Sequence, residues 1–204
     1  MPDLMQTTAN ALQYNGFEVY TVSSATEARN LMLSLIPAGA SIGVGGSMTI
    51  RELGVVEALQ SADHAIAWHW LPSEDRAAVL RDAAQADFYL TSSNAVTSDG
   101  QLVNIDGNGN RVAAMIHGPK NVIAAVGINK LVDGGMNSAI ARIKQYACPL
   151  NARRLGIDTP CARTGRCDMN DCGDMTLCSI TAAIRRPAKG RRFIVILIKQ
   201  ALGY

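Results

Sequence analysis

Apolar residues along the chain follow two patterns, one with the period of a helix and one of short continuous runs. The helical period appears over 28–35, directly after the capping box Ser24-Ala-Thr-Glu27. Further helices are predicted from about Thr49, where a second capping box begins, over 74–86 after a Ser73 cap, and over 136–147. Continuous apolar runs predict strands at 41–44, 65–68, 88–91, 112–116, 122–126 and 192–198.

Strands that alternate with helices are typical of an α/β fold. Because the runs at 112–116 and 122–126 have no polar face, they indicate strands that are buried on both sides. We therefore predict a mostly parallel central sheet with helices on both faces. Between 95 and 112, Gly, Asn and Asp residues dominate and favour hairpins instead.

Length and composition narrow the class of protein. The 204 residues, 48% of them hydrophobic, suggest a single domain over 1–204 with a sizeable core. A net charge of +2 is too balanced for nucleic acid or an anionic membrane to be the main partner. No run of about 20 apolar residues predicts a membrane span, and the first ten residues lack the features of a signal peptide. We expect a cytoplasmic protein, and the low charged fraction of 18% makes a homo-oligomer plausible.

A glycine-rich loop, Gly43-Val-Gly-Gly-Ser-Met-Thr49, joins a predicted strand to a predicted helix. Such a loop brings backbone amides close to a ligand, and the positive end of the helix favours an anion. Gly45, Gly46, Ser47 and Thr49 are therefore candidate ligand-binding residues. A tight turn before a capped helix explains the same residues without any ligand.

A second polar stretch, 92–111, follows the strand at 88–91. Open α/β sheets bind ligands at the carboxyl ends of their strands, so these side chains are candidates for holding a small polar molecule. The candidates here are Asn94, Thr97, Asp106, Asn110 and Arg111. Ordinary turn chemistry of Asn, Asp and Gly is the alternative interpretation. His117 is either a candidate acid or base or a core residue.

Five cysteines gather towards the C-terminus, in a segment over 148–189 that predicts a long loop. Loops of that length are usually functional or held by something. Cys161, Cys167, Cys172 and Cys178 fall within 18 positions and are candidate ligands of one metal centre, with an iron–sulfur cluster ahead of zinc. A reversible disulfide and ordinary reduced thiols remain open.

Three motifs together resemble the lactate-utilization (LUD) domain family. They are Gly45-Gly-Ser-x-Thr-x-x-Glu52-x-Gly54, the stretch from Ser93 to Val112, and Gly118-Pro-x-x-Val122 followed by Val126-Gly-x-Asn-Lys130. The closing cysteines resemble the stand-alone, cysteine-bearing members, although the spacing from Cys167 to Cys172 is longer than their usual close pair. The resemblance adds Glu52 to the candidate ligand-binding residues.

The resemblance implies an isomerase/CoA-transferase-like fold, related to the folate cyclo-ligases. It also implies an accessory or redox role in the oxidation of lactate, a small hydroxy acid, to pyruvate, beside iron–sulfur partner proteins. In this hypothesis a small anionic ligand occupies the glycine-loop pocket and a cysteine-bound metal centre moves electrons. The alternatives are a non-redox small-molecule-binding protein or enzyme with structural cysteines, and a regulatory subunit. The sequence assigns no catalytic residue and does not decide whether the chain is an enzyme.

Overall fold

The protein, described from a computed structural model, is defined over residues 3–168 and 172–204. Its centre is a six-stranded sheet in the order β1-β10-β7-β4-β2-β3, in which every neighbouring pair is parallel. The strands are β1 (Glu18–Val22), β2 (Ile42–Val44), β3 (Ile66–Trp68), β4 (Phe88–Thr91), β7 (Asn121–Gly127) and β10 (Arg192–Ile198).

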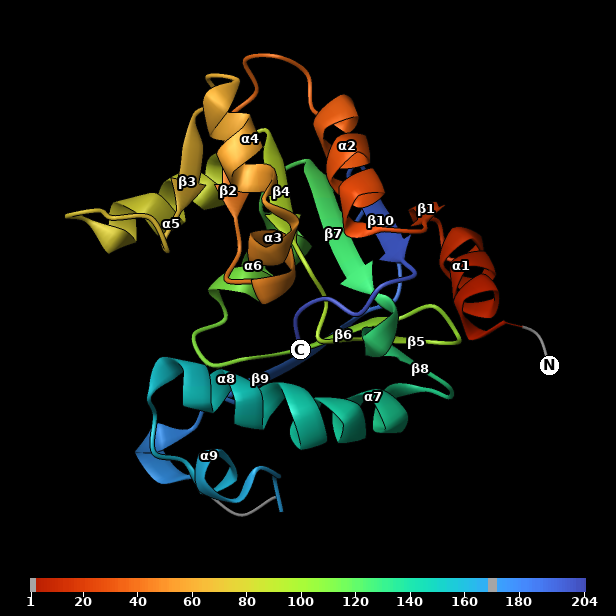
Figure 1. Cartoon of the computed structure of the whole chain (residues 1–204), viewed down its shortest axis with the longest axis vertical. Helices are drawn as coiled ribbons and strands as arrows, with labels where there is room; N and C mark the ends of the chain where they lie inside the picture. The colour runs from red at the N-terminus through yellow and green to blue at the C-terminus, as the bar shows by residue number, and fades with distance from the viewer. Residues whose placement is uncertain (1–2, 169–171) are drawn as a thin grey trace.

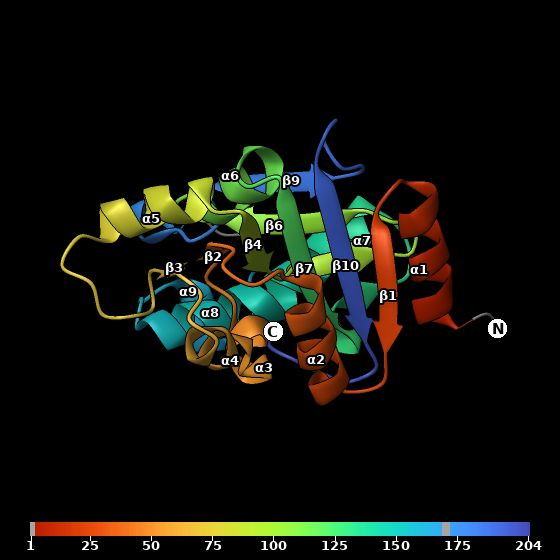
Figure 2. The ribbon, with the colours of Figure 1, turned by 90° about the horizontal axis from the view of Figure 1, so that it is seen from above.

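Helices cover both faces of this sheet, as Figure 2 shows. Ile123 and Ala125 of β7 face one core with α2, α3 and α4, while Val122 and Val126 face the other core with α1 and α6. This alternation explains why the strand reads as one continuous apolar run. The covering helices are α1 (Leu4–Tyr14), α2 (Ala25–Leu35), α3 (Met48–Leu53), α4 (Val55–Ser61), α5 (Arg76–Gln85) and α6 (Asn110–His117).

A smaller sheet, in the order β8-β5-β6-β9, lies at the carboxyl ends of the central strands (Figure 1). Its antiparallel pairs are β5–β6 and β6–β9, and β5 pairs with β8 in parallel. A helical run packs against it through Ala139, Ile143 and Ala147. The elements of this part are β5 (Ala95–Thr97), β6 (Leu102–Asp106), η1 (Ile128–Lys130), β8 (Leu131–Val132), α7 (Met136–Arg142), the π-helix η2 (Ile143–Ala147), α8 (Cys148–Leu155), α9 (Pro160–Thr164), η3 (Gly173–Met175) and β9 (Ile180–Ile184).

The predicted fold class is confirmed, with a parallel central sheet and helices on both of its faces. The strand predicted at 112–116 is wrong, because these residues lie in α6. The long loop predicted over 148–189 is also wrong in part, since α8, α9 and β9 fall inside it. Three residues of that segment, 169–171, lie outside the described residues.

The helix starts differ from the predicted ones at two of three places. Ser24 caps α2 as predicted, and its side chain accepts a hydrogen bond from the Glu27 amide at 3.2 Å. The cap of α3 is Ser47 and not Thr49, and the cap of α5 is Asp75 and not Ser73. In the described ranges, none of the helices combines the length and the apolar character needed to cross a bilayer.

Candidate functional site

A polar cavity of about 230 Å³ opens between the carboxyl ends of β2 and β4 and the helix α8. Its size lies below the roughly 300–1,000 Å³ that is usual for drug-sized ligands, which favours a small molecule. The lining of this polar cavity includes Ser47, His69, Trp70, Arg76, Ser92, Asn94, Asp106, Arg111, Lys130, Cys148, Arg154 and Tyr204.

The glycine-rich loop forms one wall of the polar cavity. Gly46 and Ser47 line it, whereas Gly45 lies just behind the wall. A Cβ atom at Gly45 would stand 2.8 Å from the Tyr89 hydroxyl and 3.3 Å from Cγ of Arg111, so only glycine lets the loop pack this closely. The Ser47 hydroxyl accepts the Ile50 amide at 3.3 Å and thereby starts α3. The loop thus combines both interpretations of the sequence, a capped turn and a cavity wall.

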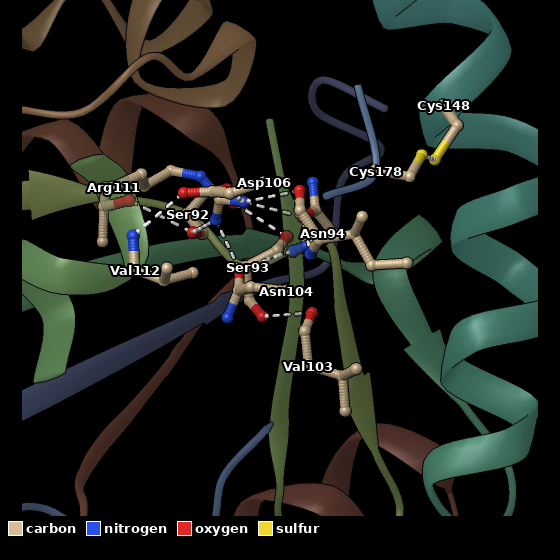
Figure 3. A network of polar contacts seen from close by, with 12 residues as sticks. Ser92, Ser93, Asn94, Val103, Asn104, Asp106, Arg111, Val112, Cys148 and Cys178 are labelled. Carbon is tan, nitrogen blue, oxygen red and sulfur yellow. Dashed lines mark hydrogen bonds and ion pairs between the residues drawn. The ribbon is translucent and has the colours of Figure 1, made fainter. Parts of the chain in front are cut away.

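Arg111 is the centre of a buried polar network (Figure 3). Its two terminal nitrogens donate to the side chains of Asn94, Asn104 and Asp106, and also to the backbone carbonyls of Ser92 and Ile105. All of these acceptors belong to the protein. A carboxylate that bound both terminal nitrogens of Arg111 would have to displace Asp106 or the asparagines, so we regard Arg111 as the residue that positions this wall.

Asp106 connects the network to the start of α6. One carboxylate oxygen pairs with Arg111, and the other accepts the backbone amide of Val112 at 3.0 Å. A negative charge at the first turn of a helix is stabilised by the free amides and by the helix dipole. Because Gly109, the residue before α6, has no side chain that can cap it, Asp106 supplies this cap from the end of β6.

Lys130 is a further candidate site residue, and it is not among the residues predicted from the sequence. It ends the short helix η1 after β7 and is 3% exposed. Its amine donates to the hydroxyls of Thr49 at 2.7 Å and Ser92 at 3.0 Å. Burial, together with the positive charges of Arg142 and Arg111, lowers the pKa of Lys130 to about 7, although Glu52 acts in the opposite direction. A signal was available, because a lysine stands four positions after the end of the strand predicted at 122–126, in the motif Val126-Gly-x-Asn-Lys130.

The mouth of the polar cavity is cationic and aromatic. The guanidinium of Arg154 lies over the Trp70 ring at 4.7 Å and donates from Nε to the Tyr204 hydroxyl at 2.7 Å. Desolvation, followed by the charges of Arg76 and Arg154, lowers the pKa of His69 and favours its neutral form. The Nδ1 atom of His69 is buried and has no hydrogen-bond partner in the described part of the chain.

The structure places the ten predicted ligand-binding residues in two groups. Six of them line the polar cavity: Gly46, Ser47, Asn94, Asp106, Asn110 and Arg111. The other four do not, namely Gly45, Thr49, Glu52 and Thr97. Thr49 contacts the cavity indirectly through Lys130, and Glu52 accepts the Gly203 amide at 2.7 Å. The Thr97 hydroxyl bonds Asp99 and the Gln101 carbonyl in the turn between β5 and β6, which is a structural role. His117 is exposed at the end of α6, so it is not a core residue; it does not line the polar cavity, and its role as an acid or base stays a prediction.

All five cysteines line a second cavity of about 120 Å³ beside the first, together with Lys144. We call it the cysteine cavity. Within it, the Sγ atoms of Cys148 and Cys178 are 3.3 Å apart and point toward one another in Figure 3. The hydrogen bond from Cys148 lowers the pKa of Cys178 to about 6, and the same pairing raises that of Cys148. Cys148 lines both cavities, so the two sites share a wall.

The fit of a metal centre to the cysteine cavity is incomplete. The number of thiols is sufficient for a cluster or for zinc. In the ranges 3–168 and 172–204, however, no three or more His, Cys, Asp or Glu side chains are grouped so that they could hold a metal ion. The five thiols therefore line one cavity, but in the described residues they are not grouped as the ligands of one metal ion. We derive no chemical step through a metal.

Comparison with known proteins agrees with this architecture. The model of the LUD domain family matches residues 5–198, and the chain therefore belongs to the LUD domain family. A solved structure described as a DUF162 family protein from Deinococcus radiodurans is similar over 96% of each chain, with a TM-score of 0.56 and 15% sequence identity. At that identity the similarity concerns the fold alone. The search of curated proteins gives no match.

Proposed function

We propose that this LUD-domain protein binds a small carboxylate in the polar cavity and serves as an accessory component in the oxidation of a small hydroxy acid such as lactate. The observation that carries the proposal is Lys130, a buried amine at the cavity that has no carboxylate within ion-pairing distance among the described residues. Burial without a counter-charge favours the neutral form of this amine, and a bound anion would stabilise its protonated form.

The charges around the polar cavity support an anion. Arg76, Arg111 and Arg154 line it, and Asp106 is the carboxylate among its lining residues. Asp106 is already paired with Arg111, so the remaining cations have no acidic partner in the wall. Like-signed groups around a cleft raise the local concentration of the opposite ion, and a low dielectric strengthens the attraction.

The cysteine cavity supports the redox part of the proposal because it adjoins the ligand site through Cys148. An iron–sulfur cluster held there would supply one-electron transfer next to the bound acid. Zinc, or no metal at all, would instead make the cysteines structural. That outcome would favour a non-redox binding protein or enzyme. The observation that supports this alternative is that the possible metal ligands of the described residues do not form a group of three or more.

The binding half of the proposal is tested by calorimetric titration of lactate into the wild-type protein and two charge-reversal variants. Arg154→Glu changes a cation that lines the polar cavity, whereas Arg153→Glu makes the same change one residue away on α8, outside the lining. We expect Arg154→Glu to raise the dissociation constant of lactate at least about tenfold, which corresponds to a loss of about 1.4 kcal/mol of binding free energy. Arg153→Glu should change it by less than about twofold, because Arg153 does not line the polar cavity and its charge is screened from the ligand by salt. Equal effects of the two variants, or no binding of lactate to the wild-type protein, would remove the proposal.

A further inference from the structure

We propose that Lys130 forms a reversible imine with the carbonyl carbon of a small 2-oxo acid bound in the polar cavity. This inference rests on the proposed function, since it assumes that the cavity takes a small carboxylate. It adds the class of the ligand and assigns a nucleophile. A 2-oxo acid is also the product expected when a 2-hydroxy acid is oxidised.

The hydrogen bonds around Lys130 fit a neutral amine. Thr49 donates its own hydroxyl proton to the Leu202 carbonyl at 3.1 Å, and Ser92 donates to the Ser93 carbonyl at 3.4 Å. Both hydroxyls must therefore accept from Nζ of Lys130, which donates to each of them. Two acceptors satisfy the two N–H bonds of a neutral amine and leave its lone pair free. An ammonium group has three N–H bonds, and the part of the chain that the structure describes offers no third acceptor.

The charges that face Lys130 also favour the neutral form. Arg111 and Arg142 are the cations that act on it, and Glu52 is the one acidic group that acts in the opposite direction among the described residues. Glu52 accepts the Gly203 amide and makes no ion pair with the lysine. The pKa of Lys130, at about 7, leaves a large fraction of the amine unprotonated at neutral pH. Nucleophilic lysines are activated in this way, by desolvation and by neighbouring cations.

The C-terminal segment packs closely beside the amine without a side chain over it. Gly203 has a φ of +58°, and a Cβ atom at this position would lie 2.6 Å from Oγ1 of Thr49 and 3.3 Å from Nζ of Lys130. Glycine thus serves two purposes here, a left-handed backbone and the absence of a side chain over the amine. Tyr204, the next residue, lines the polar cavity.

The proposed step conserves atoms and electrons. The lone pair of Nζ attacks the carbonyl carbon, the π electrons of the carbonyl move to its oxygen, and one proton passes from nitrogen to that oxygen. The resulting carbinolamine loses water as the C=N bond forms, and hydrolysis reverses the sequence. Thr49 and Ser92 lie within hydrogen-bonding distance of Nζ and are positioned to relay the proton. No oxidant or reductant takes part.

The test is reductive trapping of the full-length protein with pyruvate, as a small 2-oxo acid, and sodium cyanoborohydride. Intact-mass measurement and peptide mapping then locate the added carboxyethyl group. We expect one group per chain on the peptide that contains Lys130, formed at least about tenfold faster than on any other lysine. Lys130→Arg should abolish this labelling, and Lys199→Arg, which removes an exposed lysine that lines neither cavity, should leave it unchanged.

Two further measurements on the unaltered protein test whether labelling of Lys130 depends on a carboxylate. Acetone, a ketone without a carboxylate, should label Lys130 much more slowly than pyruvate, and lactate should compete with pyruvate on the unaltered protein, even if the variants fail to fold. Labelling that is spread over surface lysines, or absent at Lys130 while lactate binds in calorimetry, would overturn the imine and leave the carboxylate site standing. If neither lactate nor pyruvate binds, the proposed function fails as well.

Discussion

The buried pair of Arg111 and Asp106 should hold the wall of the polar cavity in place, and a double-mutant cycle measures how strongly. Asp106→Ala leaves the guanidinium without its counter-charge and also removes the acceptor of the Val112 amide. Removing one member of a buried pair costs about 3–5 kcal/mol. We expect the lower end, about 3 kcal/mol, because Asn94 and Asn104 still accept from Arg111.

Arg111→Ala should cost as much or more, since it leaves the Asp106 carboxylate without its counter-charge and removes one of the two donors of each asparagine oxygen. The double variant removes both charges, so its loss should fall short of the sum by at least about 1 kcal/mol. Denaturant unfolding measures these differences. In a chain of this length about 3 kcal/mol also corresponds to a fall in melting temperature of about 6–12 °C.

The matched control is the exposed pair of Arg192 and Glu18, whose side chains are 41% and 35% exposed. Glu18→Ala should cost no more than about 1 kcal/mol, because water and salt screen such a pair. Two observations would refute the reasoning. One is a cost for Asp106→Ala as small as that of Glu18→Ala, and the other is strict additivity in the cycle.

Three further predictions follow from the two cavities. The unfolding free energy of the wild-type protein relative to Lys130→Met should increase from about pH 7 to about pH 10. The reason is that the lysine of the unfolded chain keeps its proton until about pH 10.4, whereas the folded one, with a pKa of about 7, has lost it. A difference in unfolding free energy that stays constant over this range would contradict the lowered pKa. Mild oxidation with diamide should join Cys148 to Cys178, whose sulfurs are 3.3 Å apart, before any other pair, and peptide mapping that finds a different first pair would contradict the arrangement. In metal analysis of protein purified without oxygen, iron and acid-labile sulfide that Cys167→Ser removes would support the redox role of the cysteine cavity, whereas zinc or a metal-free protein would favour structural cysteines.

The central strands were predictable because burial on both faces leaves a direct trace in the sequence. The runs at 88–91, 122–126 and 192–198 are continuous and apolar, and all three lie side by side in the parallel sheet. The run at 112–116 has the same appearance and is a helix. A short apolar run does not by itself distinguish a buried strand from a buried helix. Here the start of α6 is fixed by the Asp106 carboxylate, which bonds the Val112 amide six positions away and carries no local signal.

The site was predictable in its location and less so in its chemistry. Gly46, Ser47, Asn94 and Asp106 line one cavity because the loops that follow β2 and β4 leave the same edge of the central sheet, and the end of β6 in the smaller sheet meets them there. The importance of Lys130 depends on Thr49 and Ser92, which are 81 and 38 positions away and become its neighbours only in the folded chain. No local pattern reports such a contact.

Determining a crystal structure of the protein grown with lactate tests the central claim most directly. The account predicts one lactate in the polar cavity, between Ser47 and Ser92, with its carboxylate or hydroxyl within hydrogen-bonding distance of Nζ of Lys130. A polar cavity that contains only water at saturating lactate, or a lactate bound elsewhere on the chain, would contradict it.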